Sequence, residues 1–322
     1  MSTVNDQESS SKQHVVIAGG GVVGTCTAYF LAKNHGISST IVDPSGQIAP
    51  AASGKAGGFL ALGWNPGPLA ALERRSFALH QEIADSLGAE NIDYRRLTCA
   101  SIGVDSSTRK PSGRKFKDIE WAEDDSDGKS GVVSFQLLGN EETIAQVHPK
   151  KLCESLWAES CRIIEASGNT RKNELVKEKV TSMQNQNEDG KSSLAVKLDN
   201  GNNILADGLL LACGPWTANI MTGIKYHSVI IPTEKVLNQC VFFSGMGDPE
   251  IYVRPDSTAY CTGFPDAPVK VTEHPGKEEV RQESVDRIVS AARGASGKNP
   301  KSDGSLAAEP ISANACYLPS SK

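Results

Sequence analysis

Apolar and polar positions change period twice within the first fifty residues, and this change predicts a strand, a helix and a second strand. Residues 14–18 form a short apolar run that is typical of a buried strand. A helix is predicted over 23–34, followed by Gly36 as its end signal, and a second strand is predicted over 39–43. These elements form one βαβ unit, which implies a parallel sheet with a right-handed crossover.

Two longer helices are predicted further along the chain. Pro68 opens the first helix, which carries apolar side chains at helical spacing and is closed by Gly88. Pro149 begins the second, which is expected to run to residue 166 with Leu152 on its apolar side. Residues 106–131 lie between the two helices, and their polar and charged composition predicts an exposed insertion.

The remaining patterns favour strands. Strands are predicted at 99–105, 179–183, 194–198, 204–206 and 209–213, with Asn200-Gly201 as a hairpin turn. After residue 229 the sequence is β-rich and aromatic, with a charged amphipathic helix over 277–293, a flexible loop over 294–305 and a last strand over 313–318. The whole pattern predicts an α/β fold in which a β-rich domain is inserted into a βαβ-type sheet domain.

Composition and charge narrow the function by exclusion. The 322 residues carry a formal net charge of −5, so no nucleic-acid partner is expected. The basic run at 109–117 is followed by acids at 120–127, as in a solvated loop. No apolar run approaches the ~20 residues of a membrane span, and residues 1–13 form a polar tail without a signal-peptide core. A cytoplasmic protein with a disordered N-terminal tail is therefore expected.

The eight cysteines give no sign of a metal site. They form no C-x-x-C pair, and no histidine lies at ligand spacing to them. A cytosolic chain of this length needs no disulfides, so most of these thiols are expected to be buried as small apolar groups.

A glycine motif lies between the first predicted strand and the first helix. Gly19, Gly21 and Gly24 give the spacing G-x-G-x-x-G. The first glycine permits a tight turn, the second lets the backbone approach a pyrophosphate, and the third lets the helix pack on the strand. Asp43 ends the second strand, where a carboxylate can accept hydrogen bonds from ribose hydroxyls. The residues expected at the dinucleotide are Gly19, Gly20, Gly21, Val22, Val23, Gly24 and Asp43.

The following segment favours a flavin over a nicotinamide. The stretch "AASGKAGGFLA" over 51–61 is rich in small residues, and an extended FAD needs a second loop to hold its flavin end. Ser53 can bond a phosphate oxygen, and the small residues allow close backbone approach. The residues expected there are Ser53, Gly54, Lys55, Ala56 and Gly57. The alternatives are a plain flexible loop and a nicotinamide dehydrogenase, which would bind no yellow chromophore.

These segments together resemble the D-amino-acid oxidase, glycine oxidase and sarcosine oxidase superfamily of FAD-dependent amine oxidoreductases. Further matches are "VHPKKL" from residue 147, Val180, and "DGLLLACGPW" over 207–216. Within the superfamily, "ASGKAGGFLALGW" and "ACYLP" are most similar to a eukaryotic branch of FAD oxidoreductases, of which a fungal member is linked to endosome-to-Golgi traffic. The resemblance implies a Rossmann-like FAD-binding domain with an inserted β-rich, glycine-oxidase-like substrate domain.

The resemblance also implies how the chain is divided. The FAD-binding domain is expected over 14–75 and 145–228, and the substrate domain over 76–144 and 229–315. Residues 316–322 would begin a further segment of the FAD-binding domain. Because the relatives continue beyond this point, the chain resembles a truncated product that binds FAD weakly and turns over poorly.

Transferred to this sequence, the family's cofactor contacts fall on few residues. The glycine turn would approach the diphosphate and Asp43 the adenosine ribose. Val180 would meet adenine through its backbone, and Gly214 and Trp216 would lie close to the cofactor. The implied reaction is oxidation of a C–N bond in a small-molecule amine or amino acid, with hydride transfer to flavin and reoxidation by oxygen. The alternative is an FAD-binding protein with little turnover, acting in endosomal trafficking or as a truncated isoform.

No catalytic residue is predicted. His148 is expected to cap the helix that Pro149 begins, in preference to a catalytic role. Tyr252 and Arg254 lie where the family places substrate groups, although a surface arginine is the expected environment for Arg254. Some relatives attach flavin through a cysteine in a setting similar to that of Cys316, but thiols in apolar strands are usually inert.

Overall fold

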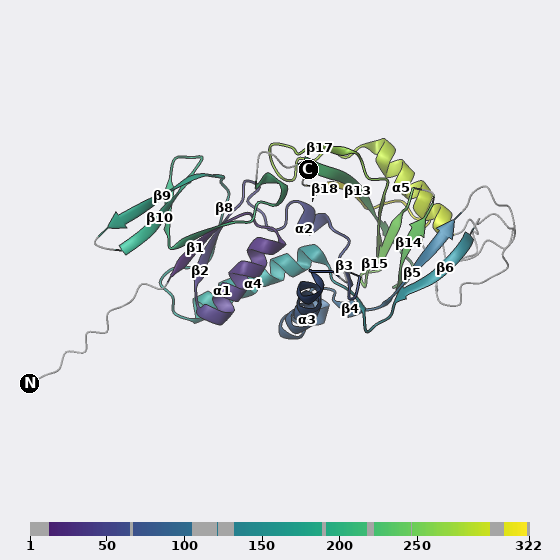
Figure 1. Cartoon of the computed structure of the whole chain (residues 1–322), viewed down its shortest axis with the longest axis horizontal. Coiled ribbons are helices and arrows are strands. Elements are labelled where there is room, and N and C mark those ends of the chain that lie inside the picture. The colour runs from purple at the N-terminus through teal and green to yellow at the C-terminus, as the bar shows by residue number, and fades with distance from the viewer. Residues whose placement is uncertain are drawn as a thin grey trace, which may run out of the picture. The chain divides into compact units, whose positions relative to one another are not determined.

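The computed structural model describes residues 13–64, 67–104, 121, 132–188, 191–217, 222–245, 247–296 and 306–320. The chain forms two compact units (Figure 1): unit 1 is Met1–Pro50 with Cys153–Thr217, and unit 2 is Ala51–Leu152 with Ala218–Lys322. The predicted tail, insertion and flexible loop lie outside the described residues, except for residues 13, 121 and 294–296. None of the described helices is long and apolar enough to span a bilayer.

Unit 1 is built on a parallel sheet of four strands. Their order across the sheet is β12 (Gly208–Leu211), β1 (His14–Ala18), β2 (Ser38–Val42) and β8 (Glu174–Val176). All three pairings are parallel, so the predicted βαβ unit is confirmed. The sequence analysis missed β8, because its three residues are too few to show a period.

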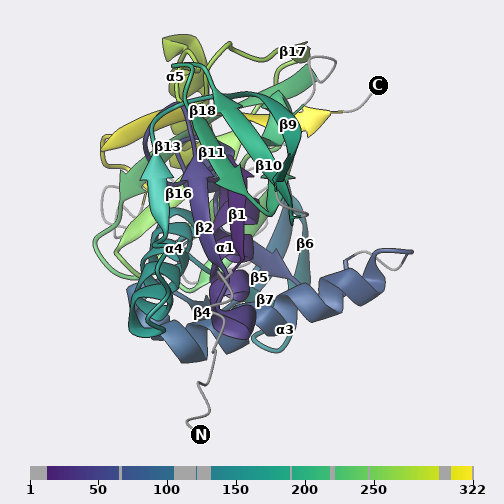
Figure 2. The same cartoon turned by 90° about the vertical axis from the view of Figure 1, so that its left-hand side faces the viewer.

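The two faces of this sheet have different covers. On one face, Ala28 of α1 (Val22–His35) packs on Ile17 and Ile41, together with Cys153 of α4 (Pro149–Ala166). On the other face, Val16 contacts an antiparallel sheet of three strands (Figure 2). These strands are β9 (Val180–Glu188), β10 (Lys191–Leu198) and β11 (Asn203–Ala206). The predicted hairpin at Asn200-Gly201 joins β10 to β11 and is confirmed.

Unit 2 contains one large, mostly antiparallel sheet. Its strands, in order, are β17 (Pro268–Lys270), β13 (Thr222–Pro232), β16 (Thr258–Gly263), β15 (Glu250–Val253), β14 (Gln239–Ser244), β5 (Thr98–Val104) and β6 (Val132–Gly139), while β18 (Ser312–Ser320) pairs with β13. The pairing of β14 with β5 is parallel, and the others are antiparallel. The β-rich texture predicted after residue 229 is confirmed.

Helix α5 (Gln282–Ala295) runs along this sheet (Figure 1), and its apolar side joins the main core of unit 2. The helix begins five residues later than the predicted start at residue 277. Residues 277–281 are not helical, because the Glu278 carboxylate binds Lys55 and the Arg281 N–H donates to Nε2 of His227 (3.2 Å). Tertiary contacts therefore replace the helical pattern there.

A smaller sheet completes unit 2. It consists of β3 (Phe59–Ala61), β7 (Ile144–Gln146) and β4 (Arg95–Arg96), and helix α3 (Ala70–Leu87) belongs to the same unit. The segment predicted to be a glycine-rich loop contains β3 and a single helical turn, α2 (Ala52–Lys55), so that prediction is wrong in detail.

Trp121 corrects the prediction of an exposed insertion over 106–131. Its side chain is 1% exposed, and its indole N–H donates to the Gln239 carbonyl (2.8 Å). The polar residues around Trp121 concealed a single large apolar group, which contributes to the core beside β14.

Candidate functional site

The glycine turn of unit 1 follows β1 directly and is closely packed by backbone. A Cβ on Gly19, whose φ is +111°, would lie 2.4 Å from the Ala212 carbonyl oxygen. A Cβ on Gly24 would lie 2.1 Å from the Gly19 carbonyl oxygen. Neither position admits a side chain without backbone movement, so the turn and α1 approach each other as a dinucleotide-binding turn requires.

The N-terminus of α1 has the properties of an anion site. Gly21 is its N-cap and makes no side-chain capping bond, and no acidic residue lies in the first turn. The positive end of the helix dipole therefore has no local carboxylate to balance it. Val22 and Val23 at this end are 38% and 57% exposed, so this end of the helix is open to solvent.

Asp43 links the end of β2 to the glycine turn. Its Oδ2 accepts a hydrogen bond from the Gly20 N–H (3.0 Å), and its Oδ1 accepts from the N–H (3.0 Å) and hydroxyl (2.6 Å) of Ser45. The Ala49 N–H in turn donates to the Gly20 carbonyl (2.9 Å). One carboxylate oxygen thus keeps acceptor capacity, while the rest of the group fixes the turn.

Other predicted residues lie at the same edge of the parallel sheet. Gly214 follows β12, and nothing lies within 4 Å of the position of its absent Cβ. Trp216 belongs to the 3₁₀ turn Gly214–Trp216, and Val180 begins β9 shortly after β8. Ligands of open α/β sheets bind at the carboxyl ends of the strands. Gly214 and Trp216 follow β12 at that end, and Val180 comes soon after the end of β8.

The second group of predicted residues lies in unit 2. Ser53, Gly54 and Lys55 belong to α2, and Ala56 and Gly57 follow it. Three hydrogen bonds hold this loop in unit 2. Lys55 Nζ donates to Glu278 Oε2 (2.6 Å) and to the Ala315 carbonyl (3.0 Å), and Arg254 Nη2 donates to the Ala56 carbonyl (3.3 Å). The ammonium of Lys55 is therefore already neutralised by a carboxylate with no exposed side-chain surface.

Gly57 lies against the ring of Tyr252. A Cβ at this position would be 2.1 Å from Cδ2 of that ring. Unit 2 thus brings the predicted flavin-side loop together with Tyr252 and Arg254, although Arg254 lies 198 positions after Ala56 in the sequence. Tyr252 lies on β15 and Arg254 directly follows that strand, and no local sequence pattern relates this strand to the loop.

Arg254 is buried, and the expectation of a surface arginine is wrong. Its side chain is 7% exposed, and its guanidinium lies 5.4 Å from the centre of the Tyr260 ring. Within the described part of the chain it forms no ion pair, and its Nε has no hydrogen-bond partner. Burial lowers the pKa of this guanidinium and the charges of Asp256 and Asp93 oppose that effect, but neither carboxylate forms a direct ion pair with it. Its remaining donors can therefore bind an anionic group supplied by a ligand.

His148 has a structural position. Its Nδ1 accepts the Lys151 N–H (3.4 Å), and its carbonyl accepts the Leu152 N–H (2.9 Å), so it caps α4 as predicted. Possible metal-ligand atoms of His148, Asp93 and Asp256 lie within 4.8 Å of one another, a grouping that the sequence analysis missed. Lys151 Nζ binds Asp93 (2.7 Å), and burial followed by the charge of Arg254 lowers the pKa of His148.

Comparisons with known proteins agree with this geometry. A family model described as "FAD dependent oxidoreductase" (DAO) matches residues 14–295. The chain belongs to the DAO family of FAD-dependent oxidoreductases. A Schizosaccharomyces pombe protein named as an oxidoreductase is 30% identical over 290 residues, which cover 81% of this chain and 72% of the relative. FAD is therefore the cofactor, and the predicted choice of flavin over nicotinamide is confirmed.

Solved structures that are similar to this chain support the fold. Glycine oxidase from Geobacillus kaustophilus has a TM-score of 0.68 at 16% identity, covering 96% of this chain and 83% of that chain. L-proline dehydrogenase from P. horikoshii has a TM-score of 0.67 at 15% identity, covering 95% and 81%. The predicted α/β fold of glycine-oxidase type is confirmed.

The residues of this DAO-family chain fit a dinucleotide such as FAD. The glycine turn is a cradle that a Cβ would fill, and the adjacent helix end lacks an acidic residue. Contact with FAD remains a prediction for each of the cofactor-binding residues named in the sequence analysis. The thiol of Cys316 is a poor candidate for a covalent link, because burial raises its pKa and the thiolate is the reactive form.

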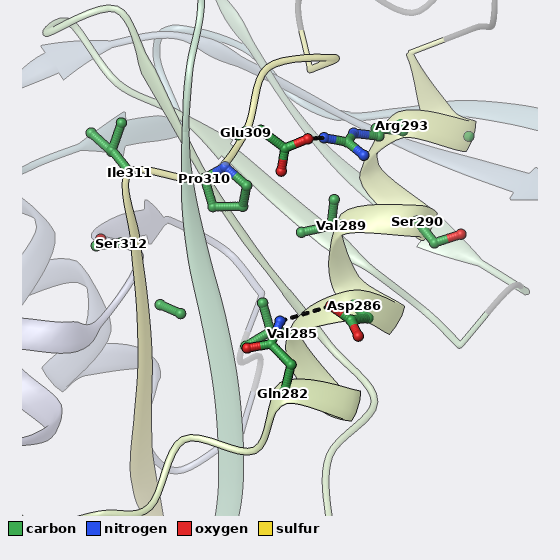
Figure 3. A pocket seen from close by; sticks show the side chains of 12 residues that line it. Gln282, Val285, Asp286, Val289, Ser290, Arg293, Glu309, Pro310, Ile311 and Ser312 are labelled. Atoms are coloured by element: carbon green, nitrogen blue, oxygen red, sulfur yellow. Dashed lines mark hydrogen bonds and ion pairs between the residues drawn. The ribbon is translucent and has the colours of Figure 1, made fainter.

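A separate hollow of about 830 Å³ lies beside α5 (Figure 3). Val285 and Val289 line it from the helix, and Pro310 and Ile311 line it from the segment before β18. Arg293 and Glu309 form an ion pair across its rim (2.5 Å). None of the predicted cofactor residues lines this hollow.

Proposed function

We propose that the chain is an FAD-dependent oxidoreductase that oxidises a C–N bond of a small amine or amino acid. The observation that carries this proposal is the buried guanidinium of Arg254 beside the loop Ala51–Gly58, which forms no ion pair within the described residues and whose Nε has no hydrogen-bond partner. An arginine fork binds a carboxylate through two parallel hydrogen bonds, which fixes its orientation. Aromatic rings next to Arg254, above all Tyr252 and Tyr260, would exclude water from such a substrate.

The bound flavin supplies the redox chemistry, as the acceptor of the hydride equivalent from the carbon next to nitrogen. The chain supplies binding and orientation. In unit 1, the glycine turn and the α1 N-terminus would hold the diphosphate, and Asp43 the adenosine ribose. In unit 2, the loop Ser53–Gly57 would hold the flavin end, and Arg254 would orient the substrate. Oxygen would then reoxidise the flavin.

The experiment is a panel of amines and amino acids added to the purified holoprotein without oxygen, with the flavin band followed at each addition. Bleaching by one chemical class, with peroxide release in air, supports the proposal. In Arg254→Met, substrates with a carboxylate should lose binding by roughly 10- to 150-fold, while amines without one should change little. Equal losses for both classes would show that Arg254 acts only through packing.

The same panel distinguishes this proposal from the alternative, a flavin-binding protein with little turnover. A stable flavin band that no amine or amino acid bleaches would support that alternative, in which the protein acts in trafficking. A cytoplasmic location with association at endosomes is part of the same prediction. Fluorescence imaging of the tagged chain with an endosomal marker tests it.

A further inference from the structure

One face of the large sheet in unit 2 carries aromatic and polar side chains in register. Phe242 lies opposite Glu250, Glu250 opposite Thr262, and Tyr252 opposite Tyr260. Because side chains alternate along a strand, these five residues share a face. Residues at the alternate positions, such as Ile251, belong to the apolar core with α5.

Aromatic rings form a continuous group on that face. Tyr252 stacks on Tyr260 (5.7 Å between ring centres, 20°) and on Phe59 (5.6 Å, 16°), and Phe242 meets Tyr252 edge-on (5.6 Å, 67°). Trp64 lies 5.5 Å from Phe242 and is 41% exposed. Ring faces carry negative potential, so such a group attracts organic cations.

Glu250 lies at the edge of this aromatic group without a basic partner. The Tyr252 hydroxyl donates a hydrogen bond to its Oε2, and no lysine, arginine or histidine of the described ranges forms an ion pair with it. Tyr226 of β13 lies on the same face, because Ser228, two positions further along that strand, is opposite Thr262, which is in turn opposite Glu250. Burial and then the charge of Glu250 raise the pKa of this phenol. Glu278 in the same unit is paired with Lys55, so Glu250 differs in having phenols as its neighbours.

Glu250 and Arg254 lie four residues apart on one extended segment, which separates their Cα atoms by roughly 13 Å. The ring of Tyr252 stands between them in sequence and on the same face. An α-amino acid whose carboxylate binds Arg254 holds its α-amine next to that guanidinium. A cation at Glu250 must therefore be a second, distal group of a longer substrate.

From this arrangement we propose that Glu250, with Tyr226, Tyr252 and the aromatic group, is a subsite for a distal ammonium group of the substrate. The inference rests on the proposed function and narrows it. The substrate class is a basic amino acid or a diamine. A hard divalent cation would require more oxygen ligands than one carboxylate and two phenols provide.

The test compares probes that differ only in the distal charge. These are lysine against norleucine, in both enantiomers, and 1,5-diaminopentane against pentylamine. Affinity for the holoprotein is read from the shift of the flavin band or, where the band bleaches, from the dependence of bleaching rate on probe concentration. The wild-type chain should bind the charged member of a pair about 10- to 150-fold more tightly.

The variant Glu250→Gln should lose that preference while norleucine and pentylamine bind as before. Glu250→Asp should keep part of it, and the exposed Glu273→Gln serves as the matched control. Equal affinities within each pair in the wild-type chain, or an unchanged preference in Glu250→Gln, would overturn the inference. The wild-type comparison decides the question even if Glu250→Gln does not fold.

The two proposals fail in different ways. If pentylamine or norleucine perturbs or bleaches the flavin as strongly as the charged probe, the proposed function stands and the subsite at Glu250 is wrong. If no amine or amino acid perturbs the flavin, both are wrong.

Discussion

The α-carbon of Gly57 lies against the ring of Tyr252, so closely that a Cβ there would come within 2.1 Å of ring carbon Cδ2. The contact joins the loop after α2 to the face of the large sheet that carries Glu250 and Arg254. A glycine is required because no L side chain fits between the loop backbone and this ring.

The first prediction concerns this contact. Gly57→Ala forces the Tyr252 ring or the loop to move, and overpacking of this kind typically costs about 1–3 kcal/mol of stability. Urea unfolding should show that loss, and the near-ultraviolet circular dichroism of the tyrosines should change. Gly67→Ala is the control, because nothing lies within 4 Å of the position of its Cβ. Equal effects in the two variants would contradict the contact.

The second prediction concerns Asp43 and the nucleotide. Hydrogen bonds to a charged group contribute about 1.5–3 kcal/mol, so Asp43→Ala should weaken FAD binding by roughly 10- to 150-fold. Asp43 also holds the Gly20 and Ser45 amides, so a loss of stability is expected as well. ADP separates the two effects, because it carries the adenosine ribose without the flavin. An ADP affinity unchanged in a folded Asp43→Ala chain would remove the ribose role.

These first two sites show what the sequence predicts and what it misses. The glycine turn, Asp43 and the βαβ unit depend on neighbours within about thirty residues, so their spacing is visible in the chain. Arg254 and the Gly57 contact depend on a strand nearly two hundred residues later, and no local pattern reports such a pairing. The residues around Arg254 in the sequence do not distinguish it from a surface arginine, and only tertiary packing buries it.

The third prediction is a pH dependence that originates at His14. Burial lowers the pKa of this histidine to about 4, and Arg171 acts in the same direction. The unfolded chain, with the ordinary value of 6.5, therefore takes up the proton first as the pH falls. Above pH 6.5 the neutral ring makes its full contribution to the free energy of unfolding. Between pH 6.5 and pH 4 this contribution declines, by up to about 3 kcal/mol.

Urea unfolding at pH 7 and pH 5 with saturating FAD measures this decline. His14→Gln cannot titrate, so it should show a smaller loss between the two pH values than the wild-type chain. His35→Gln, at an exposed position on α1, should match the wild-type loss. An identical pH dependence in His14→Gln would rule out His14 as its source.

The fourth prediction concerns the buried ion pair of Lys55 and Glu278. Lys55→Met leaves a carboxylate with no exposed side-chain surface and no cation, and breaking such a pair costs about 3–5 kcal/mol. The double variant Lys55→Met/Glu278→Met should recover much of that loss. Arg75 and Glu82 form an exposed pair of the same length (2.6 Å), so Arg75→Met should change stability little. Similar losses for the two single variants would contradict the buried pair.

Segment 277–281 shows why the ion pair escaped the sequence analysis. Its charged residues fit an amphipathic helix with the residues that follow, and the helical prediction is correct from Gln282 onward. The bonds of Glu278 to Lys55 and of Arg281 to His227 hold the preceding residues out of the helix. Both partners lie more than fifty residues away, so periodicity alone could not separate the two parts.

The most direct measurement of the central claim is the visible spectrum of the purified chain during anaerobic addition of an amine or amino acid. The account predicts a flavin band that bleaches with a basic amino acid or a diamine and returns on admission of air, with release of peroxide. A flavin band that survives every amine and amino acid, or that bleaches only with a reduced nicotinamide, would contradict it.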